Sequence, residues 1–199
     1  MAHGAAIQHL TEEFSLQVGA CITRWADIEE ELFEICVACL GCGPERAAIV
    51  YYRTPTIDAR LKLVDELVEV VLPKRQRPSG SHDHPYLKRW RGVQGDFVDA
   101  LRVRNRIAHQ PMGPRRQVST LGVVTSIPYH ETWFEISSAA NEQYRKKSAK
   151  SLPPLRLMDL QAHHREVMSL RQALHSFRTE VLPSHGVTSP WPAPQPTPR

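Results

Sequence analysis

Apolar residues recur at helical spacing through the first forty positions of the chain. From Thr11 to Leu40 they alternate in steps of four and three, and this unbroken stripe predicts one helix of about 30 residues. Thr11 precedes two glutamates, which is typical of a helix start, and Gly41 is suited to a left-handed helix end. The stripe consists of Phe14, Val18, Cys21, Trp25, Ile28, Leu32, Ile35 and Cys39, and the opposite face carries Glu29, Glu30, Glu31 and Glu34.

Four further helical patterns follow, and each is bounded by a proline or a capping residue. They predict helices over about residues 44–52, 56–72, 86–110 and 159–181. Pro111 ends the third of these, because proline disfavours helical geometry in the residue before it. The basic segment 73–85 is rich in Pro, Gly and Ser and predicts a mobile loop. The fold class is therefore all-α, a bundle of four to five helices.

Residues 111–137 have a different character from the rest of the chain. Two β-branched and aromatic runs, 117–125 and 132–136, predict a small β-hairpin insertion at about residues 112–137. From Pro183 onward, six prolines preclude a packed element, so we predict a disordered Pro-rich tail at 183–199. The remainder, residues 1–182, is predicted to form one helical domain.

The charge of the chain is unevenly distributed along its length. The formal net charge is +4, but residues 1–70 carry −7 and residues 71–199 carry +11. Either the two parts attract each other, or the basic part meets a phosphate-rich partner. No apolar run has the length of a membrane helix, and the N-terminus lacks the basic start of a secretory signal. We therefore expect a protein of the cytoplasm with no membrane association.

Cysteine and histidine supply the candidate metal ligands of the chain. All four cysteines fall within the first 42 residues, and Cys36, Cys39 and Cys42 are spaced like a metal tract. However, no matching Cys or His pair follows at zinc-finger spacing, and Cys21 and Cys39 belong to the apolar stripe. We predict core thiols, no metal and no cofactor. His163 lies on the apolar stripe of the last helix, and we predict a hydrogen-bonded interior or edge histidine there rather than a ligand.

The end of the fourth predicted helix carries the most informative cluster of polar residues. On a helical wheel Arg104 falls on the buried stripe, whereas Asn105 and His109 fall at its border. A buried guanidinium needs an anion, an amide or a partner chain, and Asn105 can supply an amide oxygen. Arg104 and His109 point about 140° apart on an ideal helix. Either two antiparallel copies bring them together, or the helix unwinds at Ala108 and His109 swings back.

This Arg-Asn-x-x-x-His sequence at a helix end resembles the motif of the HEPN superfamily. The resemblance covers about residues 11–182, since the earlier helices also look similar to that family. The similar upstream residues are Trp25, Ile28, Glu29, Leu32, Phe33, Thr56, Ile57, Arg60 and Leu61.

The resemblance implies a helical bundle that forms a homodimer and, in active members, cleaves RNA without a metal. The arginine and histidine of both copies meet in one cleft, and attack by the ribose 2′-OH leaves a 2′,3′-cyclic phosphate. By this resemblance Arg104 holds the phosphate, Asn105 orients Arg104, and His109 acts as base or acid.

Two further questions follow from the same resemblance. The basic residues around the motif suit an RNA backbone, namely Arg102, Arg106, Arg115 and Arg116. Many similar domains are non-catalytic dimeric binding or scaffold modules, and this alternative stays open. A ribonuclease of this kind would be a toxin or a defence component, and its partner would be an antitoxin or another protein.

Overall fold

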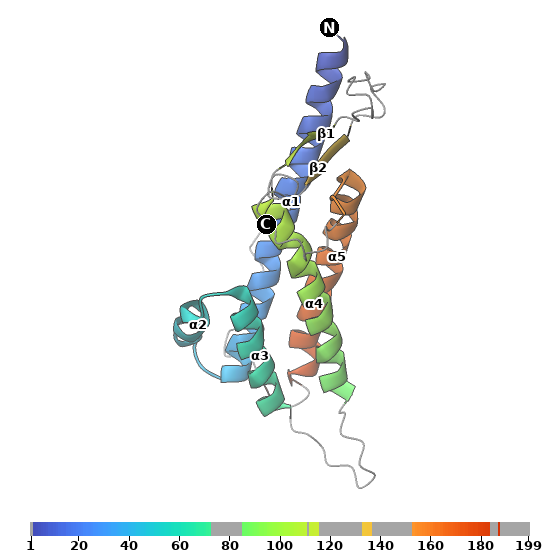
Figure 1. Ribbon diagram of the computed structural model, residues 1–199. Coiled ribbons are helices and arrows are strands. Elements are labelled where there is room, and N and C mark those ends of the chain that lie inside the picture. The colour runs from blue at the N-terminus through green and yellow to red at the C-terminus, as the bar shows by residue number, and fades with distance from the viewer. Residues whose placement is uncertain are drawn as a thin grey trace, which may run out of the picture. The chain divides into compact units, whose positions relative to one another are not determined.

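The computed structural model consists mostly of helices, which confirms the predicted all-α class. It describes residues 2–72, 85–110, 112–115, 133–136, 153–183 and 187. The helices are α1 (Ala2–Leu40), α2 (Pro44–Arg53), α3 (Ile57–Val71), α4 (Pro85–His109) and α5 (Leu157–Ser176), and a π-helical turn, η3 (Phe177–Val181), continues α5 (Figure 1). No helix in these ranges combines the length and apolarity needed to cross a bilayer. Most of the predicted loop 73–85 and of the predicted tail 183–199 lies outside the described residues.

The contacts of the chain group it into two compact units. Unit 1 comprises Met1–Trp25 and Ala100–Val167, and unit 2 comprises Ala26–Asp99 and Met168–Arg199. We predicted a single domain over 1–182, and α1, α4 and α5 each contribute residues to both units.

The boundaries of α1 and α5 differ from the prediction. α1 begins at Ala2 rather than Thr11. The preceding residues include three alanines and no proline, so they favour continuing the helix, and Thr11 lies inside it. α5 begins at Leu157, two residues early. The Asp159 carboxylate accepts from the backbone N–H of Arg156 at 2.7 Å, which stabilises the start of the helix.

Unit 1 has a small apolar core built from the first half of α1 and the facing ends of α4 and α5. The Sγ atom of Cys21 lies 3.5 Å from the carbonyl oxygen of Leu160, so α1 and α5 are in direct contact here. The core residues are Phe14, Cys21, Ile107, Leu155 and Leu160, with Leu10, Val18, Val103 and Leu157 packed against them.

Two short strands also belong to unit 1. β1 (Met112–Arg115) pairs antiparallel with β2 (Trp133–Ile136), and Met112 lies opposite Ile136. β2 falls within the predicted strand 132–136. The other predicted strand, 117–125, lies outside the described residues, and β1 precedes it.

Unit 2 is organised around the second half of α1. Gly41 adopts φ +60° and its N–H bonds to the Val37 carbonyl at 3.1 Å, which ends α1 as the sequence predicts. Thr56 caps α3 through a 3.2 Å bond to the N–H of Ala59, also as predicted. Figure 1 shows α3 beside the last turns of α1, with the short α2 next to them.

Arg60 joins these three helices within unit 2. Its Nε donates to the Thr54 carbonyl at 3.0 Å, and its Nη1 lies 3.4 Å from the carboxylate of Glu29. The guanidinium also stacks over the rings of Tyr51 and Tyr52, at 5.2 and 5.4 Å from their centroids. Arg60 therefore has a structural role in unit 2.

Glu31 is buried, although the sequence places it on the polar face of α1. Only 7% of its surface is exposed, and Arg178 and His175 contact its carboxylate. Charges from the acidic first part of the chain thus pair with cations from the basic part. This observation favours mutual attraction as one explanation of the uneven charge.

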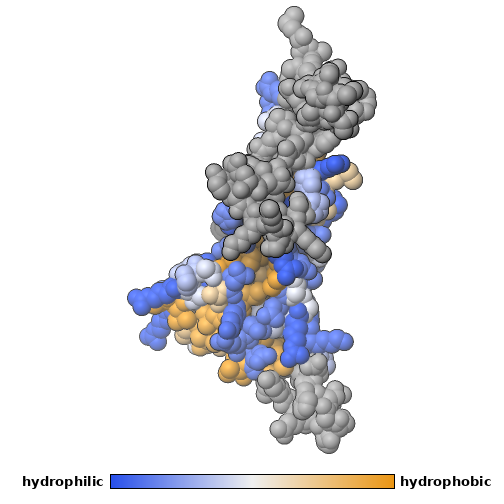
Figure 2. Space-filling model, in the orientation of Figure 1, coloured by the Kyte–Doolittle hydropathy of each residue, from blue (hydrophilic) through white to orange (hydrophobic). Residues whose placement is uncertain are grey.

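Unit 2 also exposes several large apolar side chains. Ile49, Val50 and Tyr52 on α2 and Val70 on α3 are exposed, and Figure 2 shows apolar surface in the region of α2. Grouped exposure of this kind is typical of interaction surfaces.

Candidate functional site

The motif residues lie in unit 1, on the last two turns of α4. The helix continues without interruption to His109, and the N–H of Gln110 still bonds to the Arg106 carbonyl at 3.0 Å. The alternative in which the helix unwinds at Ala108 is therefore wrong. The side chains of Arg104 and His109 therefore point in different directions, and one helix alone does not bring them together.

The buried face of α4 is rotated in its last turns. Ala108 falls at the helical spacing of the buried Trp90, Phe97 and Leu101, yet it is exposed, and Ile107 is buried instead. The reason is that Val103 and Ile107 pack against the core of unit 1. Arg104 is partly buried as a result.

The guanidinium of Arg104 is only partly satisfied. Its Nη1 donates to Oδ1 of Asn105 at 3.2 Å, so the neighbouring amide supplies one partner. Its Nε is buried and has no hydrogen-bond partner in the described part of the chain. A buried donor in this state costs free energy that a bound anion or a second chain would recover.

His109 has a different environment. Its side chain is exposed at the end of α4. Within the described residues, no hydrogen bond joins His109 to Arg104 or Asn105. The imidazole is therefore accessible to a ligand, and nothing described within the chain orients it.

The four arginines predicted to bind RNA have unequal environments. Arg102 is exposed. Arg106 is half-buried and its Nη2 donates to the Pro153 carbonyl, so it is engaged in holding α4 to the segment before α5. Burial lowers the pKa of Arg106, and Asp159 opposes this shift. Arg115 belongs to β1, and its side chain and Arg116 lie outside what is described.

The unpaired buried side-chain atoms of the described residues all belong to unit 1. Within the described ranges, every such side-chain atom comes from the end of α4 or from two adjacent histidines of α5. The residues are Arg104, Arg106, Gln110, His163 and His164.

His163 is an interior residue, as predicted, but it lacks the predicted hydrogen bond. It is 2% exposed, and neither ring nitrogen has a partner among the residues described. Oε2 of Glu166 lies 3.8 Å from Nδ1, which is beyond hydrogen-bonding distance. Burial lowers the pKa of His163, and the nearby Glu166 opposes this effect, so the neutral ring is favoured.

The cysteines are interior thiols rather than an evident ligand set. All four are free; Cys21 and Cys36 are buried, and Cys39 and Cys42 are partly buried. Burial raises the pKa of Cys21 and of Cys36 to about 11, and that of Cys39 to about 12. Over the described ranges, no three His, Cys, Asp or Glu side chains gather in a metal-binding cluster.

A second polar cluster, in unit 2, was not singled out by the sequence. Oε1 of Glu31 lies 3.1 Å from Nδ1 of His175, and Nε of Arg178 donates to Oε2 of Glu31 at 3.1 Å. A signal was present: Arg171, His175 and Arg178 are spaced four and three residues apart, the spacing of one helical face. The spacing alone did not show which helix faces these residues.

Comparison of the chain with protein-family models, with curated proteins and with solved structures finds no significant match. The case for a function therefore rests on the residues of this chain.

Proposed function

We propose that this chain is a HEPN-type RNA endonuclease that acts as a homodimer and needs no metal. The observation that carries the proposal is the state of Arg104. Its guanidinium is held by Asn105 on one side, and its buried Nε has no partner in the described residues. A guanidinium with a donor that has no partner in the described residues can bind an anion from outside the chain.

The chemistry of the motif fits phosphodiester cleavage. A guanidinium presents planar paired donors that match two phosphate oxygens and stabilise the charge that develops on them. The imidazole of His109 is accessible, and imidazole is the side chain best suited to proton transfer near neutral pH. His109 would take the proton of the ribose 2′-OH or protonate the leaving 5′-oxygen. The product is a 2′,3′-cyclic phosphate.

Two copies of the chain are part of the proposal for a geometric reason. α4 is regular through His109, so Arg104 and His109 of one copy diverge by about 140°. An antiparallel partner helix would bring its His109 toward the Arg104 of the first copy. The exposed position of His109 at the helix end supports such a contact.

A non-catalytic dimeric binding or scaffold module is the second candidate. It is favoured by the absence, among the described residues, of a hydrogen bond that would orient His109. Catalytic histidines commonly have such an orienting partner.

The proposal is tested by digesting a random-sequence RNA pool in the presence of a chelator. We expect the wild-type chain to cleave and to leave 2′,3′-cyclic phosphate ends, detected by mass spectrometry. The same pool made with 2′-deoxy nucleotides should resist, because the attacking hydroxyl is missing. Arg104→Ala and His109→Ala should be inactive.

The matched control is His9→Ala, which removes an exposed histidine of α1 and should cleave like the wild type. Cleavage that persists in both Arg104→Ala and His109→Ala would remove the proposed site. Absence of cleavage by every protein, with RNA binding retained, would favour the binding module.

A further inference from the structure

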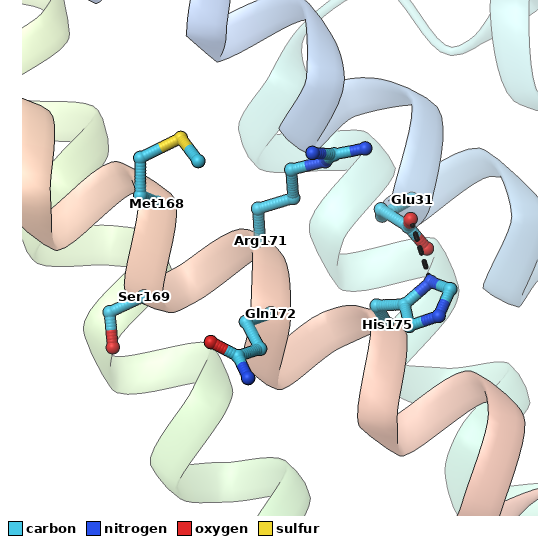
Figure 3. Close-up of a pocket in the computed structure, with 6 residues that line it drawn as sticks. All are labelled: Glu31, Met168, Ser169, Arg171, Gln172 and His175. Atoms are coloured by element: carbon cyan, nitrogen blue, oxygen red, sulfur yellow. Dashed lines mark hydrogen bonds and ion pairs between the residues drawn. The ribbon is translucent and has the colours of Figure 1, made fainter.

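A pocket of about 580 Å³ lies in unit 2, away from the motif in sequence. Glu31 of α1 and five residues of α5 line it, and Figure 3 shows the ring of His175 facing Glu31, with Arg171 one turn earlier on α5. Its volume is within the range of small-molecule sites. The α5 residues are Met168, Ser169, Arg171, Gln172 and His175.

The buried carboxylate in this pocket is already neutralised. Glu31 accepts from Nε of Arg178 at 3.1 Å and lies 3.1 Å from Nδ1 of His175. Each carboxylate oxygen of Glu31 thus has one nitrogen donor, from Arg178 or from His175. A cationic ligand would find no free negative charge here, so Glu31 serves to position the histidine.

His175 is oriented so that its other nitrogen remains available. Nδ1 lies within reach of both Oε1 of Glu31 and Nη2 of Arg178, which is 3.2 Å away. With Nδ1 donating to Glu31, Nε2 carries a hydrogen when the ring is protonated, and an anionic ligand would bind this form. The side chain is 53% exposed, so this Nε2–H can donate to a ligand.

Arg171 adds an uncommitted positive charge to the same pocket. In the described part of the chain neither the side chain of Arg171 nor that of Gln172 makes a hydrogen bond or ion pair. Ser169 contributes a hydroxyl, and the partly exposed Met168 contributes an apolar wall. The pocket therefore combines an oriented imidazole, a guanidinium that has no side-chain partner among the described residues, and neutral donors next to an apolar side chain.

We propose that this pocket binds a small molecule that carries a phosphate or carboxylate group. The anionic group lies on Arg171 and His175, with Gln172 as a further donor. The apolar portion of the ligand lies against Met168. Arginine and imidazolium form the strongest hydrogen bonds with such anions. This inference is independent of the proposed ribonuclease activity, because it uses different residues in a different unit.

Isothermal titration calorimetry of the full chain tests this inference. The probes are adenosine 5′-monophosphate, inorganic phosphate and succinate, with adenosine as the uncharged control. We expect at least one anionic probe to bind and adenosine to bind more weakly. Phosphate and succinate distinguish the two sources of the anionic group.

Variants locate the binding. Arg171→Gln and His175→Gln should each lower the affinity for the anion by about tenfold or more, since each removes a charge-assisted hydrogen bond. Arg165→Gln removes an exposed cation of the same helix outside the pocket and should bind like the wild type. Circular dichroism verifies that the variants are folded.

The proposal is overturned if no anionic probe binds the wild type. It is equally overturned if Arg171→Gln binds as tightly as the wild type, or if Arg165→Gln loses as much affinity as Arg171→Gln. Binding of an RNA oligonucleotide without binding of any small anion also contradicts it, because the site would then recognise nucleic acid.

Discussion

Replacing Arg104 by alanine is expected to lower RNA cleavage by about 100- to 1,000-fold without a matching loss of stability. Removing a positioned donor to the charged transition state has effects of this size. Stability should be spared because the partners of Arg104 are few. Within the described residues its guanidinium donates to the next residue of the same helix, and its Nε is buried without a partner.

Two companion variants separate charge from packing. Arg104→Met keeps an apolar stem of similar length and should be at least as stable as the wild type in urea unfolding, yet inactive. Arg104→Lys keeps the charge but loses the planar fork, so it should recover only part of the activity. If Arg104 instead bridges helices, Arg104→Met will unfold at clearly lower urea concentrations.

Replacing Trp90 by alanine is expected to cost about 3–5 kcal/mol of the unfolding free energy of unit 2. Trp90 is 1% exposed and its ring packs against Phe177 with centroids 5.0 Å apart. Its Nε1 also donates to Oδ1 of Asp65 at 2.8 Å. Alanine leaves a cavity and an unpaired carboxylate oxygen at once.

Trp90→Phe isolates the hydrogen bond, because the phenyl ring retains most of the packing, and it should cost about 1–3 kcal/mol. Urea unfolding followed by circular dichroism measures both variants. A loss below about 1 kcal/mol for Trp90→Ala would contradict the described packing.

The helices could be predicted from the sequence because each buries an apolar stripe of regular spacing. The stripe of α1 contains Phe14, Trp25 and Ile28, and all three are buried. Gly41 and Thr56 also end and begin helices as predicted, since their roles depend on local backbone geometry.

The burial of Glu31 could not be predicted, because the spacing of apolar residues along one helix does not show how many other helices pack against it. Near the end of α1 the buried face is wider than one stripe, and it includes Cys36, Val37 and Ala38 as well as Glu31. The carboxylate is tolerated there because Arg178 of η3 supplies a cation to it and the ring of His175 on α5 lies against its other oxygen.

In the candidate site, too, contacts between neighbouring residues could be predicted, whereas contacts between residues far apart in the sequence could not. The contact between Arg104 and Asn105 joins adjacent residues, and the wheel placed Arg104 toward the core. The bond from Arg106 to the Pro153 carbonyl spans 47 residues, so no local pattern indicated that Arg106 is engaged in packing.

The most direct test of the central claim is a mixture of two inactive variants. If Arg104 of one copy acts with His109 of the other, a mixed dimer of Arg104→Ala and His109→Ala retains one complete pair. Random exchange makes half of the dimers mixed, so we expect recovery of up to about a quarter of wild-type cleavage. Each variant alone should stay inactive, and a mixture that stays equally inactive after verified subunit exchange would contradict the shared site.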